Sequence, residues 1–120
     1  MEALLVDDNP GVVRVVGRML IDAGYNTKTS MNFSTAMAEL RGAAPDVVVV
    51  DVRLGEFNGL QLAITARRQA PGVRIVVISG WDDPTLRAQA EACTAAYLIK
   101  PFTSAELIHA INSDERECVH

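Results

Sequence analysis

The apolar residues of this chain gather in four short runs rich in valine, isoleucine and leucine, separated by longer mixed segments. Short β-branched runs bounded by loop residues are typical of buried strands in a parallel sheet. A fifth stretch, over 25–29, is polar but β-prone, as expected of an edge strand. The four apolar runs cover residues 3–6, 47–50, 75–78 and 97–99.

Between the runs, apolar residues recur at the spacing of an amphipathic helix. The first helical segment begins near Pro10, which suits a first turn, and ends at Gly24, which suits a helix end. Thr103 and Glu106 form a capping-box pattern at the start of the last one. The alternation predicts an α/β fold, a doubly wound (βα)₅ parallel sheet with right-handed crossovers and strand order 2-1-3-4-5. The three helices between are expected over 33–40, 60–70 and 84–92.

Each apolar run ends on a polar residue that can carry chemistry. Asp7 and Asp8 follow the first run, Asp51 the second, Ser79 the third and Lys100 the fourth. Parallel strands end at one edge of the sheet, where open α/β sheets place their sites. We therefore expect three carboxylates, a hydroxyl and an ammonium to converge there from distant parts of the chain.

Such a cluster needs either a retained proton or a hard cation. Two carboxylates about 4 Å apart repel by roughly 4 kcal/mol at a surface-like dielectric, and one lysine leaves three of them net negative. No cysteine or histidine is near these positions in the sequence, so the ligand set is all oxygen. Oxygen ligands favour Mg²⁺, or Mn²⁺, over zinc or copper. A lysine and a hydroxyl beside an acidic cation site indicate phosphoryl chemistry.

Composition narrows the class of protein. With 120 residues, 49% of them hydrophobic, the chain fits one domain over 1–113, and the polar residues 114–120 fit a tail or the start of a linker. The formal charge of −4 argues against direct nucleic-acid binding. No apolar stretch approaches a membrane span, no signal peptide precedes the first strand, and the two cysteines lack metal or redox spacing, so we expect a cytoplasmic protein.

Four segments, in this order and spacing, resemble the response-regulator receiver domain of two-component signalling, which implies a flavodoxin-like fold. The resemblance extends over essentially residues 2–113. The matching segments are 5–9 (LVDDN), 51–60 (DVRLGEFNGL), 79–81 (SGW) and 97–102 (YLIKPF).

The resemblance implies a phosphoacceptor and a cation site. Asp51 would accept a phosphoryl group from the phosphohistidine of a sensor histidine kinase or a phosphotransfer protein. Asp8, helped by Asp7, would hold Mg²⁺ together with Asp51 and the backbone carbonyl of Arg53. The domain would be a signalling module that assists its own phosphorylation and slow dephosphorylation, rather than an enzyme acting on other substrates.

The resemblance also implies a switch. Lys100 would bind the phosphoryl group, and Ser79 would hydrogen-bond to it and move. Tyr97 would follow, changing the surface of the fourth helix, fifth strand and fifth helix, which a downstream effector or output domain would sense. A cis peptide is implied at Lys100–Pro101. A phosphorylation-linked homodimer is compatible with this scheme, although Ala95 and Ala96 replace acidic residues that support one form of dimer.

Two further departures lie beside the acceptor. Gly55 stands where the family often has proline, which favours a freer loop after Asp51. Arg53 and Trp81, two residues after the acceptor and two after the hydroxyl, are both bulky and are predicted to flank the pocket. A covered pocket would slow attack by water on the phosphoryl group.

Two other functions remain open on the residues alone. A phosphatase with an aspartyl-phosphate intermediate shares the nucleophile, cation and lysine, but it normally has a general-acid aspartate where this chain has Arg53. A degenerate receiver that only docks to other proteins would not need the acidic cluster, Ser79 and Lys100.

Overall fold

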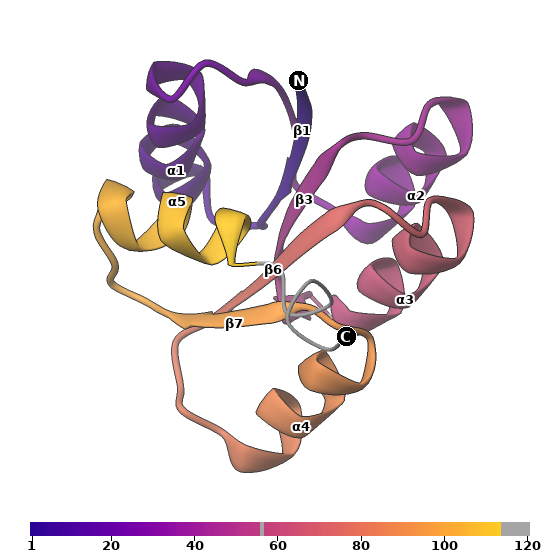
Figure 1. Ribbon diagram of the computed structural model, residues 1–120, viewed down its shortest axis with the longest axis vertical. Helices are drawn as coiled ribbons and strands as arrows, with labels where there is room; N and C mark the ends of the chain where they lie inside the picture. Colours follow the sequence, from indigo (N-terminus) through magenta and orange to yellow (C-terminus); the bar gives the residue numbers. More distant parts are fainter. Residues whose placement is uncertain (56, 114–120) are drawn as a thin grey trace.

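The computed structural model describes residues 1–55 and 57–113 of the chain (Figure 1). One parallel sheet organises them, with strands in the order β2-β1-β3-β6-β7. This confirms the predicted doubly wound fold, because these strands are the predicted 2-1-3-4-5 in chain order. The strands are β1 (Glu2–Val6), β2 (Asn26–Ser30), β3 (Val47–Asp51), β6 (Arg74–Ser79) and β7 (Ala96–Ile99).

Helices cover both faces of this sheet (Figure 1). α1 and α5 pack on one face, and α2, α3 and α4 lie on the other. The helices are α1 (Pro10–Asp22), α2 (Phe33–Gly42), α3 (Leu60–Gln69), α4 (Pro84–Ala92) and α5 (Ser104–Asn112).

Side chains just outside the helices define where most of them begin. Asn9, Asn32 and Asp83 each accept a backbone N–H of the first turn of α1, α2 and α4. At α5, the predicted capping box is present, with Thr103 and Glu106 each accepting the other's backbone N–H. Such caps stabilise a helix by about 1 kcal/mol each, and all four stand at the end of the sheet where the site lies, because each of these helices follows a parallel strand.

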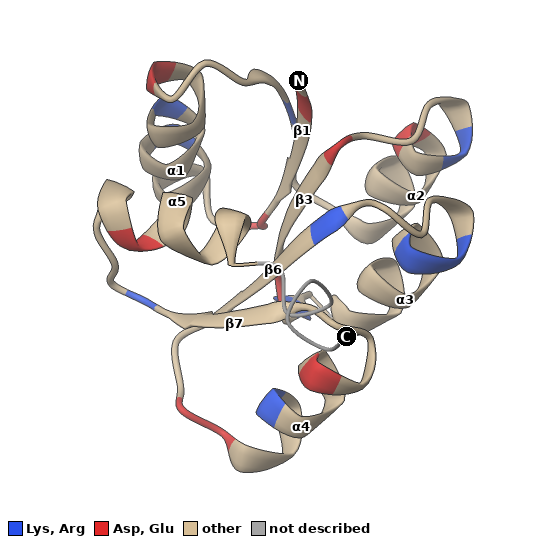
Figure 2. Ribbon diagram, viewed as in Figure 1, with Lys and Arg blue, Asp and Glu red and all other residues tan. Residues whose placement is uncertain are grey.

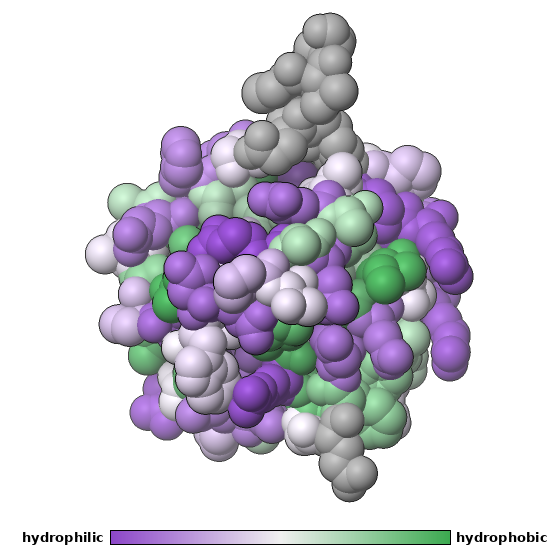
Figure 3. Space-filling model, turned by 90° about the horizontal axis from the view of Figure 1, so that it is seen from below, coloured by the Kyte–Doolittle hydropathy of each residue, from purple (hydrophilic) through white to green (hydrophobic). Residues whose placement is uncertain are grey.

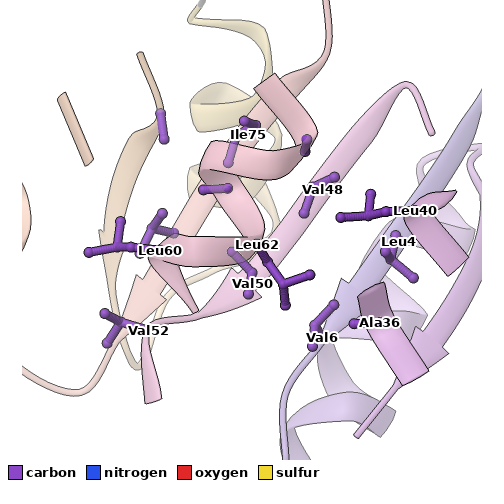
Figure 4. Close-up of a cluster of buried hydrophobic side chains, with 14 of the residues drawn as sticks. Leu4, Val6, Ala36, Leu40, Val48, Val50, Val52, Leu60, Leu62 and Ile75 are labelled. Atoms are coloured by element: carbon purple, nitrogen blue, oxygen red, sulfur yellow. The ribbon is translucent and has the colours of Figure 1, made fainter. Parts of the chain in front are cut away.

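The core consists of two layers, one on each face of the sheet. Strand β3 is completely buried, and its alternate valines point to opposite layers, Val48 and Val50 toward α2 and α3, Val47 and Val49 toward α1 and α5. Figure 4 shows the first layer. Burying each such side chain contributes about 1.5–3 kcal/mol, so β3 holds the Asp51 that ends it in a fixed position.

A small hairpin between β3 and α3 was not predicted. β4 (Arg53–Leu54) and β5 (Phe57–Asn58) pair in antiparallel fashion across a turn that contains Gly55 at φ +61°. Two-residue strands leave no periodic pattern in a sequence. The pairing depends on Gly55, because positive φ is unfavourable for residues with a Cβ.

The surface carries charges of both signs. Lysine, arginine, aspartate and glutamate are interspersed over the helices (Figure 2). The face seen in Figure 3 is mostly hydrophilic, with separate hydrophobic spots. Among the residues that the structure describes, no helix is long and apolar enough to cross a membrane.

Candidate functional site

Strand register places the predicted residues at one edge of the sheet. Val6 pairs with Val50, Asp51 pairs with Ile78 and Ser79 pairs with Ile99, so β1, β3, β6 and β7 each end within one residue of the neighbouring strand. The residues that continue each strand, including Asp7 and Lys100, therefore lie side by side at this edge.

Lys100 joins two carboxylates that are far apart in the sequence. Its Nζ lies 3.0 Å from Oδ2 of Asp7 and 3.3 Å from Oδ2 of Asp51. Asp7 is fully buried, and the side chain of Asp51 is only 10% exposed. A buried carboxylate requires a partner, and the ammonium of Lys100 donates to both.

Backbone N–H groups orient the three carboxylates. Asn9 donates its N–H to Asp7 Oδ1 at 2.9 Å, Arg53 to Asp51 Oδ1 at 3.2 Å and Gly55 to Asp8 Oδ2 at 3.1 Å. Asp8, unlike the other two carboxylates, is exposed.

Burial and neighbouring charge shift the pKa values of the paired groups. The pKa of Asp51 is raised, first by loss of solvation and then by the charge of Asp7, which together outweigh the Arg53 N–H and the Lys100 ammonium. Burial lowers the pKa of Lys100, but its hydrogen bond to Asp7 and the charges of both carboxylates outweigh that effect and raise it. Lys100 is therefore charged at neutral pH. Its single positive charge faces two carboxylates, so it does not balance their negative charge.

This cluster suits a hard divalent cation. One carboxylate oxygen each of Asp7, Asp8 and Asp51 lies within 4.8 Å of the others. The donors are all oxygen, as Mg²⁺ and Mn²⁺ prefer. The exposed Asp8 leaves the site open to solvent on one side, so an ion can keep some of its water and admit a phosphoryl oxygen.

A chain of hydrogen bonds runs from Ser79 to Tyr97. Ser79 is fully buried, and its Oγ accepts the backbone N–H of Trp81 at 3.1 Å. The Tyr97 hydroxyl donates to the Trp81 carbonyl at 2.7 Å, and the Arg87 guanidinium lies 4.8 Å from the Tyr97 ring centroid. The backbone of Trp81 thus connects the predicted hydroxyl and the predicted switch aromatic.

Arg53 and Trp81 lie against each other. The guanidinium carbon of Arg53 is 4.1 Å from the centroid of the indole, and Trp81 is 56% exposed. The two side chains extend from residues that bond to Asp51 and Ser79 through their backbones. The stacked pair therefore borders the site on its solvent side.

Two residues of the matching segments support the site in ways that the sequence analysis did not assign. Asn9 caps α1 with its side chain while its N–H orients Asp7. Gly59 passes so close to Asp51 that a Cβ there would lie 1.9 Å from the Asp51 carbonyl oxygen. The sequence signal that could have indicated this close approach is a glycine directly before the helical segment that begins at Leu60. The Lys100–Pro101 peptide is cis.

The doubly wound fold and the acidic site at its edge are those expected of a receiver domain, and a comparison with protein families agrees. The family model of the response regulator receiver domain matches residues 3–112 of this chain. The chain therefore belongs to the response regulator receiver domain family.

The relatives include regulators of transcription. The chain is 34% identical over 105 residues to the alginate biosynthesis transcriptional regulatory protein AlgB of Pseudomonas putida, covering 87% of this chain and 23% of that protein. It is 28% identical over 110 residues to the transcriptional regulatory protein GlrR of Escherichia coli K12, covering 91% of this chain and 25% of that protein. The chain thus spans about a quarter of the length of these relatives.

A solved structure shows the same fold. A response regulator protein from Burkholderia pseudomallei superimposes with a TM-score of 0.88 at 26% identity, covering 98% of this chain and 69% of that one. That structure contains a phosphorylated aspartic acid, a calcium ion and citrate.

Proposed function

We propose that this domain accepts a phosphoryl group on Asp51 from the phosphohistidine of a sensor histidine kinase or a phosphotransfer protein. The observation that supports this most strongly is the contact of Lys100 with both Asp7 and Asp51 at the end of the sheet where Ser79 also lies. A carboxylate oxygen of Asp51 attacks phosphorus, and the O–P bond forms as the N–P bond breaks. The imidazole leaves with the electron pair and takes up a proton.

Asp7, Asp8, Asp51 and the Arg53 carbonyl would hold a divalent cation, Mg²⁺ or Mn²⁺. The bound ion would supply positive charge to the phosphoryl oxygens. Lys100 is already charged, and its ammonium lies 3.3 Å from Asp51. It can turn toward a phosphoryl oxygen while it keeps its ion pair with Asp7. The Ser79 hydroxyl accepts from Trp81, so its proton can be donated to the phosphoryl group.

Phosphorylation would be read out through Tyr97. A phosphoryl group adds about −1.5 to −2 charges, and a shift of Ser79 toward it would disturb the Trp81 backbone to which Tyr97 bonds. Tyr97 also lines a hollow of about 780 Å³ bordered by α4, β7 and α5. This surface is proposed to contact a downstream effector, an output domain or a second phosphorylated copy. The cytoplasm is the proposed location, where the kinase would have its phosphohistidine.

Acetyl phosphate with Mg²⁺ distinguishes this function from its two competitors. We expect intact-mass spectrometry to show one phosphoryl group, stable enough to isolate and absent when EDTA replaces Mg²⁺. Rapid release of phosphate without an adduct would instead indicate a phosphatase. Neither adduct nor turnover would indicate a docking module. The position where a phosphatase would carry its general acid holds Arg53, which stacks on Trp81.

A further inference from the structure

The β4–β5 hairpin is joined to α2 by an aromatic contact that phosphoryl transfer does not use. The rings of Phe33 and Phe57 stack with centroids 4.7 Å apart and planes inclined by 10°. Phe33 is the first residue of α2, and Phe57, which is 51% exposed, is the first residue of β5. Such a pair contributes about 0.5–1.5 kcal/mol beyond the area it buries, so it fastens the hairpin to the body of the domain.

The same hairpin reaches Asp8. In its turn, Gly55 donates its N–H to Asp8 Oδ2 at 3.1 Å. On the inner side of the hairpin, the buried Leu54 pairs with Phe57 across the two strands. Both rings, Gly55 and Asp8 line one hollow of about 300 Å³. The aromatic stack and the Gly55 N–H are thus two ends of one small unit.

The contact between the hairpin and Asp8 matters because Asp8 is held less firmly by its surroundings than the other two carboxylates. Asp7 and Asp51 are buried and bonded to Lys100, whereas Asp8 is exposed. A carboxylate has two oxygens, so the Gly55 N–H can hold one and leave the other for a cation. Orienting a ligand before binding reduces the entropy lost on binding. Hydrogen bonds to ligating carboxylates typically change metal affinity by about 10–100-fold when they are removed.

We propose that Phe33 and Phe57 form an aromatic clasp that holds Asp8, through the Gly55 N–H, in the position from which it binds a divalent cation. The three are positioning residues and do not touch the reacting atoms. The inference rests on the proposed role of Asp8 as a cation ligand.

Two pairs of variants test the clasp. Phe57→Ala removes the ring, and its control Phe57→Tyr keeps it. Gly55→Pro removes the N–H donor and, because proline fixes φ near about −65°, also the positive-φ turn that presents it. Its control Gly55→Asn keeps the N–H in a residue that tolerates positive φ. Mg²⁺ is titrated with the fluorescence of Trp81, the single tryptophan of the chain, and Mn²⁺ is titrated by electron paramagnetic resonance, which does not depend on the indole.

The Ala and Pro variants are expected to bind both ions about tenfold more weakly, and the two controls within about twofold of wild type. Both changes act through one hydrogen bond. The double variant, Phe57→Ala with Gly55→Pro, should therefore bind no more weakly than whichever single variant binds the ion less tightly. Circular dichroism and melting in EDTA report whether each variant is folded. Should Phe57→Ala fail to fold, the comparison of Gly55→Pro with Gly55→Asn decides.

The outcomes separate the clasp from the site itself. If Asp8→Ala binds Mg²⁺ as well as wild type, the proposed cation site is wrong. If Asp8→Ala loses binding but Phe57→Ala and Gly55→Pro retain wild-type affinity, the site stands and the clasp is overturned. Tighter binding by Gly55→Pro would also overturn it, because the N–H would then compete with the cation.

Discussion

Neutralising Asp51, the proposed phosphoacceptor, should stabilise the cation-free protein. At an effective dielectric of about 20, the Lys100 ammonium 3.3 Å away attracts the Asp51 carboxylate by about 5 kcal/mol. Asp7, within 4.8 Å, repels it by about 3.5 kcal/mol, and the exposed Asp8, screened as in water, by about 1 kcal/mol. These effects nearly cancel, so the loss of solvation on burial stays largely uncompensated, which agrees with the raised pKa of Asp51.

Asp51→Asn keeps the shape and removes the charge, and Lys100 retains Asp7. We expect the variant to be more stable than wild type in EDTA at neutral pH by about 1 kcal/mol, or about 3–5 °C in melting temperature. Saturating Mg²⁺ should reverse the order. At a hundred times its Kd the ion stabilises the wild type by about 2.7 kcal/mol, whereas the variant lacks one ligand charge.

The pH dependence has a definite sign. Because the folded pKa of Asp51 lies above its ordinary value of 3.8, the stability associated with its protonated form is present below that value and is lost as pH rises through the folded pKa. The advantage of Asp51→Asn should therefore be absent in acid and appear as the pH rises. Thermal unfolding followed by circular dichroism measures it, with the exposed Asp22→Asn as control. An Asn variant no more stable than wild type in EDTA would refute this reasoning.

Three other substitutions test one contact at the site, that of Trp81, and two backbone features at the opposite edge of the sheet, where β6 and β7 begin. Trp81→Ala should speed loss of phosphate from Asp51 by about two- to fivefold, the equivalent of the 0.5–1 kcal/mol of an exposed cation–π pair, and an unchanged phosphate-release time course would show that the indole does not shield the site. Thr94→Gly should raise stability by about 0.5–1 kcal/mol, because Thr94 has a φ of 55° and the relief of about 1–2 kcal/mol exceeds the added backbone entropy. Arg67→Ala should lower the free energy of unfolding in urea by about 2 kcal/mol, since the Arg67 guanidinium donates to four backbone carbonyls, two after α3 and two before β7.

The features that follow from periodic burial could be predicted from the sequence. Valine-rich runs predict buried parallel strands, and once the strands are parallel their ends must meet. The convergence of Asp7, Asp51 and Lys100 is thus a consequence of topology, and the structure has these side chains in contact. The capping box at α5 also follows from local chemistry that depends on only a few neighbouring residues.

The features that depend on individual backbone angles or on contacts between loops could not be predicted from the sequence. The β4–β5 hairpin requires positive φ at Gly55, which the sequence permits but does not require. The hydrogen bond from the Gly55 N–H to Asp8 could not be predicted either, because it joins two loops that are far apart in the sequence. Likewise, the positions of Arg53 and Trp81 predicted that both border the acceptor, but not that one stacks on the other.

The central claim, that Asp51 is the phosphoacceptor, can be tested at the level of the residue. The protein is treated with acetyl phosphate and Mg²⁺, reduced with borohydride, which converts an aspartyl phosphate to homoserine, and sequenced by tandem mass spectrometry. We predict homoserine at position 51 in the wild type and at no aspartate in Asp51→Asn. Homoserine at Asp7 or Asp8, or undiminished labelling of Asp51→Asn, would contradict the account.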